Sequence, residues 1–166
     1  SYGNYYSEHD ACGPFSGCGN LQSIEVEDGN ECFCSVDGVL YTKNRDMIIR
    51  FPAGKEGDFI IPSEVTRIAV GAFIGCRKLK SVVIPNGIRT IPRNAFQYCG
   101  LENVTIPNSV EEISKMAFAS CESLREIIIP ESVKEINFDA FAYCENLSLV
   151  TICDGVKSIG SGAFRN

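Results

Sequence analysis

A short phrase, Ala-Phe-x-x-Cys, recurs along this chain at an almost constant spacing, and no other feature restricts the fold as strongly. Successive phenylalanines of the phrase are 23, 22 and 23 residues apart, and a further Ala-Phe pair follows after another 23 residues. The phrase is found at Phe73–Cys76, Phe96–Cys99, Phe118–Cys121 and Phe141–Cys144. A unit of this length cannot bury its own apolar face, so the units must stack and share one core.

The residues between these phrases predict strands. The pattern Leu-x-x-(Val/Ile)-x-Ile recurs from unit to unit, and β-branched residues two positions apart favour a strand. In most units a proline follows the last isoleucine, and it ends the strand because proline has no N–H for the ladder. We expect six parallel strands that line the concave wall of the stack, the first two within Leu21–Val26 and Met47–Arg50.

A repeat of about 20–29 residues with this apolar pattern is typical of a leucine-rich solenoid. The return path of each unit reads Val-x-x-Ile-x-x-x-Ala-Phe, which predicts a short extended step and then one helical turn around Ala-Phe. The expected fold class is an α/β repeat: a right-handed leucine-rich repeat solenoid with a parallel concave β-sheet, and with short strands and helical turns on the convex side. One unit is shorter, because Gly100 replaces two residues between Cys99 and Leu101.

The N-terminal part departs from the period. Residues 1–14 have an irregular sequence rich in Tyr, Gly and Ser, and we expect a mobile tail there, followed by the repeat domain at 15–166. A β-hairpin insertion near the N-terminus is expected at about 27–60, with a turn at Asp37-Gly38. The chain starts without a methionine or a leader and stops inside a unit, so we expect a processed form or part of a longer array.

Composition argues against two classes of partner. The net charge of −6 is unfavourable for a nucleic-acid partner, because phosphate binding needs clustered Lys and Arg side chains. No apolar run approaches the roughly 18 residues of a membrane span, so we expect no transmembrane segment. The 45% of hydrophobic residues is enough for a substantial core.

The repeated units resemble the BspA-like class of leucine-rich repeats, known from bacterial surface proteins and from some parasitic protists. Its pattern, Leu-x-x-Val-x-Ile-Pro-x-x-Val-x-x-Ile-x-x-x-Ala-Phe-x-x-Cys, is matched nearly throughout 62–164, and Ser35–Tyr41 with Arg50–Lys55 is similar to a hairpin insertion of these proteins. The resemblance implies an extracellular or cell-surface location and a binding or adhesion role. It transfers no catalytic residue and no cofactor. The partner that we expect is a protein, for example of a host or of the extracellular matrix, or a glycan.

Nine cysteines invite a chemical interpretation. Cys18 and the four cysteines of the repeated phrase share one position of the repeat, and stacking places such residues about 5 Å apart, which is compatible with disulfides between coils. A column of buried thiols is the simpler interpretation, because free cysteine is among the most buried residue types. Cys12, Cys32, Cys34 and Cys153 lie outside the column, and a bridge or a weak metal site at Cys32-Phe33-Cys34 stays open.

Catalytic machinery is not expected. The only histidine, His9, lies in the expected tail, so a Ser-His-Asp or Cys-His arrangement would have to recruit it from a mobile segment. A zinc site of His9, Cys12 and Cys18 would lack a fourth ligand. We therefore expect neither an enzyme nor a bound metal or cofactor.

The concave strand face is the best candidate for a functional surface. Side chains alternate along a strand, so the residues on both sides of the central Val or Ile point away from the core. The expected partner-binding residues are Arg50, Ser81, Val83, Asn103, Thr105, Glu126, Ile128, Leu149 and Thr151. The alternative is that β-branched residues such as Val83 and Ile128 favour strands wherever they point.

The expected function is thus a noncatalytic protein-binding or adhesion module of a secreted or cell-surface protein. The alternative is a structural spacer or display segment of a larger surface protein that recognises its partner elsewhere. An uncapped last unit would expose apolar edges and unpaired strand groups, which favours end-to-end self-association.

Overall fold

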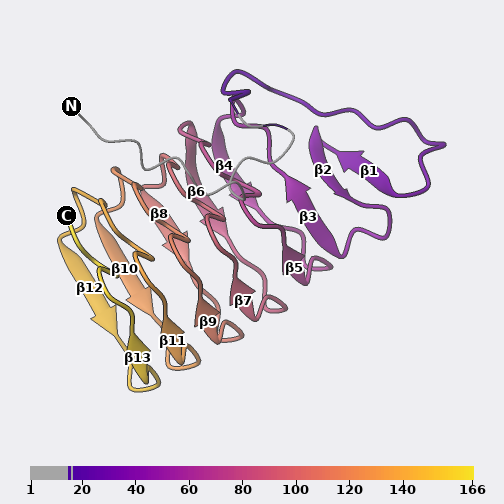
Figure 1. The fold of residues 1–166 in the computed structure, drawn as a ribbon. Coiled ribbons are helices and arrows are strands. Elements are labelled where there is room, and N and C mark those ends of the chain that lie inside the picture. Colours follow the sequence, from indigo (N-terminus) through magenta and orange to yellow (C-terminus); the bar gives the residue numbers. More distant parts are fainter. Residues whose placement is uncertain (1–14, 16) are drawn as a thin grey trace.

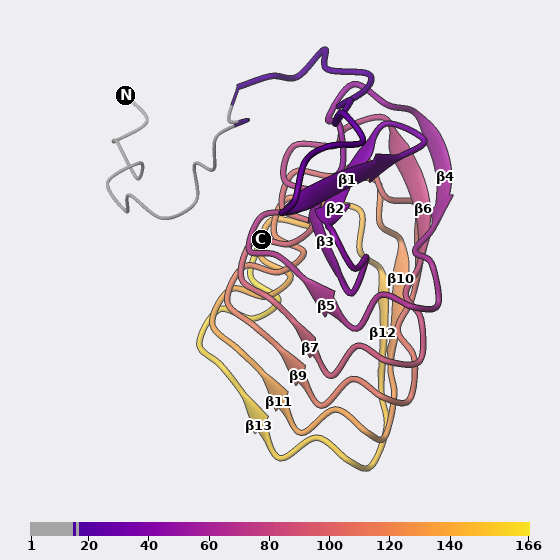
Figure 2. The same ribbon diagram turned by 90° about the vertical axis from the view of Figure 1, so that its right-hand side faces the viewer.

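The computed structural model describes residue 15 and residues 17–166, and the tail expected at 1–14 lies outside them. The described chain winds into stacked coils, and each complete coil contributes one strand to each of two ladders (Figure 1 and Figure 2). The coils follow one another in sequence order, so each coil packs against the coils before and after it. This arrangement is the parallel repeat architecture that the spacing of the Ala-Phe-x-x-Cys phrases predicts.

Five longer strands form what we call the long-strand ladder. In chain order they are β4 (Gly57–Ile60), β6 (Leu79–Val83), β8 (Asn103–Thr105), β10 (Glu126–Ile129) and β12 (Leu149–Ile152). Strands β4, β6 and β8 pair in parallel, as do β10 and β12, and β8 lies beside β10 (Figure 1). The strands predicted from the Leu-x-x-(Val/Ile)-x-Ile pattern are thereby confirmed from β6 onward.

Five two-residue strands lie on the return path of the coils. They are β5 (Arg67–Ile68), β7 (Thr90–Ile91), β9 (Glu112–Ile113), β11 (Glu135–Ile136) and β13 (Ser158–Ile159). Strands β7, β9, β11 and β13 pair in parallel, with their isoleucines in register. The short extended step predicted from the Val-x-x-Ile pattern is confirmed.

The described residues contain no helix, so the prediction of helical turns around Ala-Phe is wrong. The N–H of Ile74 donates to the carbonyl of Gly71, three residues earlier, at 3.0 Å, whereas the N–H of Phe73 donates to Ala95 of the next coil at 2.8 Å. Gly71 and Gly75 have φ values of 65° and 75°. A left-handed residue at every fourth position interrupts a right-handed helix, so this segment forms successive turns whose intervening N–H groups bond the next coil.

A three-stranded antiparallel β-meander precedes the regular coils. It contains β1 (Phe33–Val36), β2 (Val39–Thr42) and β3 (Met47–Arg50), which pair antiparallel in that order. Asp37 and Gly38 join β1 to β2 with φ values of 50° and 75°, and positive φ at both positions is what a type I′ turn requires. The predicted Asp37-Gly38 turn is confirmed.

The third strand of this meander does not belong to the long-strand ladder. Strand β3 pairs in parallel with β5, on the return path, and residues 21–26 form no strand. The long-strand ladder of the described residues begins at β4, which pairs with β6. The prediction of six strands that include Leu21–Val26 and Met47–Arg50 is therefore wrong, because the position before β6 is occupied by β4.

The core runs the length of the stack. Its largest component is a column of phenylalanine rings in which neighbouring centroids from Phe73 to Phe164 are 4.7, 5.1, 5.1 and 5.2 Å apart. Offset stacking at such distances stabilises each pair by about 0.5–1.5 kcal/mol beyond simple burial. A membrane-spanning helix, long and apolar enough to cross a bilayer, does not occur in the described part of the chain.

Candidate binding face

Two columns of outward-facing side chains cross the long-strand ladder, and together they form what we call the long-strand face. The strand register places residues of one column opposite each other, as in Ile60 with Val83 and Ile128 with Thr151. The apolar column consists of Ile60, Val83, Thr105, Ile128 and Thr151. The polar column consists of Asp58, Ser81, Asn103, Glu126 and Leu149.

The apolar column is exposed although its inward neighbours are buried. The exposed fractions of Ile60, Val83 and Ile128 are 72%, 43% and 64%, whereas Val82 and Ile127, which point inward, are 1% and 2% exposed. This contrast follows from the two-residue alternation of side chains along a strand. The face therefore presents large aliphatic side chains to solvent on a ladder that the core holds rigid.

The polar column supplies hydrogen-bonding groups beside these aliphatic side chains. The Ser81 hydroxyl donates to the Asp58 carboxylate at 2.7 Å, so two neighbouring strands are linked across the face. Asn103 and Glu126 are exposed, and Leu149 at the end of the column is 55% exposed. Eight of the nine partner-binding residues expected from the sequence thus lie on this one face.

The ninth, Arg50, does not. It lies in β3, outside the long-strand ladder, and is only 8% exposed. Its guanidinium donates to the carbonyls of Gly71 and Ile74 in the next coil, at 2.8 and 3.0 Å. The expectation that Arg50 belongs to the concave row is wrong, because its side chain satisfies turn carbonyls inside the stack.

Asp58 and Ile60 belong to the face but were missed by sequence reasoning. Both lie in β4, within the segment expected to form the hairpin insertion at about 27–60. Strand β4 begins at Gly57 with a register shift against β6, and glycine within a strand often marks such a bulge. The signal that could have located the strand is Ile61-Pro62, which lies 23 residues before Ile84-Pro85.

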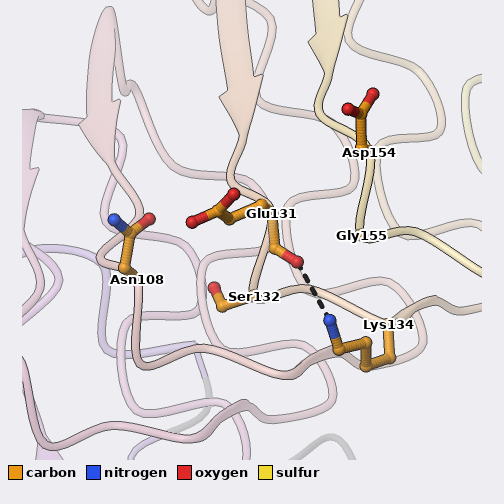
Figure 3. A pocket seen from close by; sticks show the side chains of 6 residues that line it. All are labelled: Asn108, Glu131, Ser132, Lys134, Asp154 and Gly155. Carbon is orange, nitrogen blue, oxygen red and sulfur yellow. Dashed lines mark hydrogen bonds between the residues drawn. The ribbon is translucent and has the colours of Figure 1, made fainter.

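A row of polar residues lies where the long strands end. Asn108, Glu131 and Asp154 follow β8, β10 and β12 at the same repeat position, and all three are exposed. With Ser132, Lys134 and Gly155 they line an open hollow of about 440 Å³ (Figure 3). The Lys134 ammonium donates to the backbone carbonyl of Glu131 at 3.0 Å, which leaves the Glu131 carboxylate outside this bond (Figure 3).

Four of the five cysteines predicted to form a buried column do so, whereas the fifth, Cys18, is exposed, and its place in the column is wrong. Cys76, Cys99, Cys121 and Cys144 are buried and form no disulfide. The thiols of Cys99 and Cys121 donate to the carbonyls of the phenylalanines of the preceding coil at 3.0 and 3.2 Å. Burial raises the pKa of both thiols well above the usual value, which keeps them protonated as hydrogen-bond donors.

The remaining cysteines are scattered. Cys18, Cys32, Cys34 and Cys153 also form no disulfide. The Cys34 thiol donates to the Thr42 carbonyl across the hairpin at 3.2 Å. Within residue 15 and residues 17–166, no three His, Cys, Asp or Glu side chains are grouped as a metal site would require, and His9 and Cys12 lie outside those residues.

Comparison with solved structures identifies similar folds in bacterial proteins. The pneumococcal vaccine antigen PcpA is 27% identical with a TM-score of 0.63, and the match covers 86% of this chain and 40% of PcpA. A leucine-rich cell surface protein of Faecalibacterium prausnitzii is 31% identical with a TM-score of 0.65, covering 83% of this chain and 43% of that protein. A leucine-rich repeat protein of Bacteroides ovatus is 25% identical with a TM-score of 0.61, covering 92% and 48%.

This chain spans less than half the length of each of these three solved chains. A search of curated proteins found no match. The model of the BspA type leucine rich repeat region matches residues 55–166 in 6 copies, which is more than half of the chain. The chain therefore belongs to the BspA type leucine-rich repeat family.

Proposed function

We propose that this chain is a noncatalytic protein-binding or adhesion module of a secreted or cell-surface protein, and that it binds its partner with the long-strand face. The location is supported by the relatives, since one is described as a cell surface protein and another as a vaccine antigen. The use of this face is supported by the exposed apolar column, because contiguous apolar surface marks interaction sites in soluble proteins.

One observation carries the choice of this face over the alternative that β-branched residues merely favour strands. All five members of the apolar column are β-branched, whereas none of the five members of the polar column is. Both columns lie on the same strands and point to the same side. Strand propensity alone would enrich both columns, so the restriction to one column supports a role in contact with a partner.

The test is a binding screen against extracellular-matrix and plasma proteins, with a glycan array beside it. The variant Val83→Lys/Ile128→Lys places two charges in the apolar column. The matched control is Val70→Lys/Phe138→Lys, because these side chains are 55% and 42% exposed but lie on the turns outside the face. We expect a saturable protein partner whose affinity falls at least roughly tenfold in the first variant and stays unchanged in the control.

A partner that binds both variants equally would move the site off the long-strand face. The absence of any partner would favour the alternative function, a spacer or display segment of a larger protein. That alternative is supported by one observation: the chain spans only 40–48% of the three solved chains described above, so recognition in such proteins can reside elsewhere. If a glycan binds and no protein does, the long-strand face stays the proposed site and only the class of ligand changes.

A further inference from the structure

The spacing of the apolar column matches one kind of secondary structure in a partner. Neighbouring strands of a ladder are about 4.7–4.9 Å apart, so the column offers one aliphatic or methyl group at each such step. On an α-helix, residues three or four positions apart lie on one face and are separated by about 4.5–6 Å along the axis. On an extended segment, residues on one face are about 6.6–6.8 Å apart, so they would fall out of step with the column.

The length of the column sets the length of that helix. Five strands span four steps, which is about 19 Å and corresponds to about 13 residues of α-helix. A helix of three to four turns with an apolar stripe can thus contact Ile60, Val83 and Ile128 at once. Thr105, between Val83 and Ile128, and Thr151, at the end of the column, each contribute a methyl group and a hydroxyl.

The charged side chains beside the apolar column indicate which charges the polar flanks of the partner's helix should carry. Glu131 and Asp154 lie in the row just past the ends of β10 and β12 (Figure 3), and Glu126 lies on the other side of the apolar column. Among the described residues, none of these three carboxylates forms an ion pair. Lys134 is the only cation that lines the hollow, and its ammonium is held by the Glu131 carbonyl.

The margin where the strands begin is different. There, acidic and basic side chains pair from coil to coil, as in Lys78 with Glu56 at 3.8 Å and Lys80 with Glu102 at 3.7 Å. These two pairs carry no net charge, whereas the hollow at the strand ends is lined by two carboxylates, Glu131 and Asp154, and by one ammonium, Lys134, so it is net negative. Complementary charge on a partner would therefore be positive and would lie over the strand ends.

We infer that the long-strand face binds an amphipathic α-helix of a partner protein, with its apolar stripe along the apolar column and with Lys or Arg side chains over Glu131 and Asp154. The inference rests on the proposed function and specifies its partner. The rigid ladder favours such an occupant, because a preorganised surface loses little conformational entropy on binding.

Three synthetic peptides of about 16 residues test the inference by fluorescence anisotropy with the whole chain. The first has leucines at positions i, i+3, i+4 and i+7 and lysines on the flanks; the second replaces the lysines by glutamates; the third has the composition of the first in scrambled order. We expect the first to bind at least roughly tenfold more tightly than the other two, and more weakly as salt rises. The variant Glu131→Lys/Asp154→Lys should reverse the preference between the first two peptides, and Ile60→Ser/Ile128→Ser should weaken both.

Equal binding of the first and scrambled peptides would overturn the inference, because it would show unspecific charge attraction. So would binding that survives Ile60→Ser/Ile128→Ser unchanged. If no peptide binds, while the protein screen yields a partner that is lost in Val83→Lys/Ile128→Lys, the helix inference fails and the proposed function stands. If no peptide binds and no partner is lost in that variant, both fail.

Discussion

Gly100 is a position at which one extra carbon should damage the stack. A Cβ built on Gly100 would lie 2.0 Å from the Arg77 carbonyl oxygen and 2.8 Å from the Arg77 carbonyl carbon. Both are backbone atoms of the preceding coil, so no side chain can rotate away. Ordinary contact begins at about 3.4 Å, so Gly100→Ala requires the two coils to separate by more than about 1 Å at this point.

The surroundings oppose such a displacement. The N–H of Gly100 donates to the Cys76 carbonyl at 3.1 Å, and the adjacent Cys99 and Leu101 are 2% and 0% exposed. Strain in a packed core costs about 1–3 kcal/mol, and the weakened hydrogen bond adds about 0.5–1.5 kcal/mol. We expect Gly100→Ala to lower the free energy of unfolding by about 2–4 kcal/mol.

Gly87→Ala is the matched control. Its Cβ would meet the Thr66 methyl and the Val65 carbonyl oxygen at 3.5 Å, which is ordinary contact. Because alanine restricts the unfolded chain, this variant should be neutral or more stable by about 0.4–1 kcal/mol. Urea unfolding followed by circular dichroism compares the two variants, and amide hydrogen exchange locates the loss to the coils of Cys76 and Cys99. Equal midpoints for both variants would refute the steric argument.

Four further predictions concern other parts of the stack. Phe118→Ala should cost about 3–5 kcal/mol of unfolding free energy, because the ring is buried between two others, whereas Phe138→Ala on the surface should cost about 1 kcal/mol or less; urea unfolding separates them. Burial and the raised pKa of the Cys99 and Cys121 thiols should protect them from iodoacetamide at about pH 8, while the exposed Cys18 and Cys32 react. Peptide mass spectrometry measures the labelling, and Cys99 labelled as fast as Cys32 would contradict the prediction. Hydrogen bonds from Thr42 and Arg67 lower the pKa of Asp46 below its ordinary value of 3.8. The contribution of Asp46 to stability is therefore complete above pH 3.8 and is lost as the pH falls through the lowered pKa. Melting curves should show a smaller acid-induced loss of stability for Asp46→Asn than for the unchanged chain. Ile152 and Ile159 of the last coil are 41% and 52% exposed, so we expect this chain to self-associate end to end and Ile159→Lys to abolish the association. Sedimentation across a dilution series tests this, and a single monomeric species at all concentrations excludes self-association.

The strands and the core could be predicted from the sequence because their causes are local and repeated. Val82 and Ile84 alternate with Ser81 and Val83, and Pro85 ends the strand, so a two-residue period fixes both the element and its buried side. The phenylalanine and cysteine columns follow from the period alone, since stacking places equivalent residues in contact. Eight of the nine predicted face residues were placed correctly for the same reason.

The turns around Ala-Phe could not be predicted from the same reasoning, because an apolar Ala-Phe pair fits a helix equally well. The signal lay in the residue before the alanine, which is Gly71, Asn94, Asp139 or Gly162 in four of the five coils. These residue types tolerate a left-handed backbone, and all four have φ between 55° and 68°. In the remaining coil Met116 adopts a φ of 56°, which could not be predicted from the residue type.

Arg50 and Val83 differ in a way that decides how binding experiments can be interpreted. Val83 is outward and apart from the core, so its replacement should change stability by no more than about 1 kcal/mol. Arg50 is buried and holds two carbonyls of the next coil, so its replacement would leave those carbonyls without their donor and would destabilise the stack. A loss of binding in an Arg50 variant would therefore report damage to the fold. If Val83→Lys/Ile128→Lys unfolds at the same urea concentration as its control variant, a loss of binding in this variant can be attributed to the face itself.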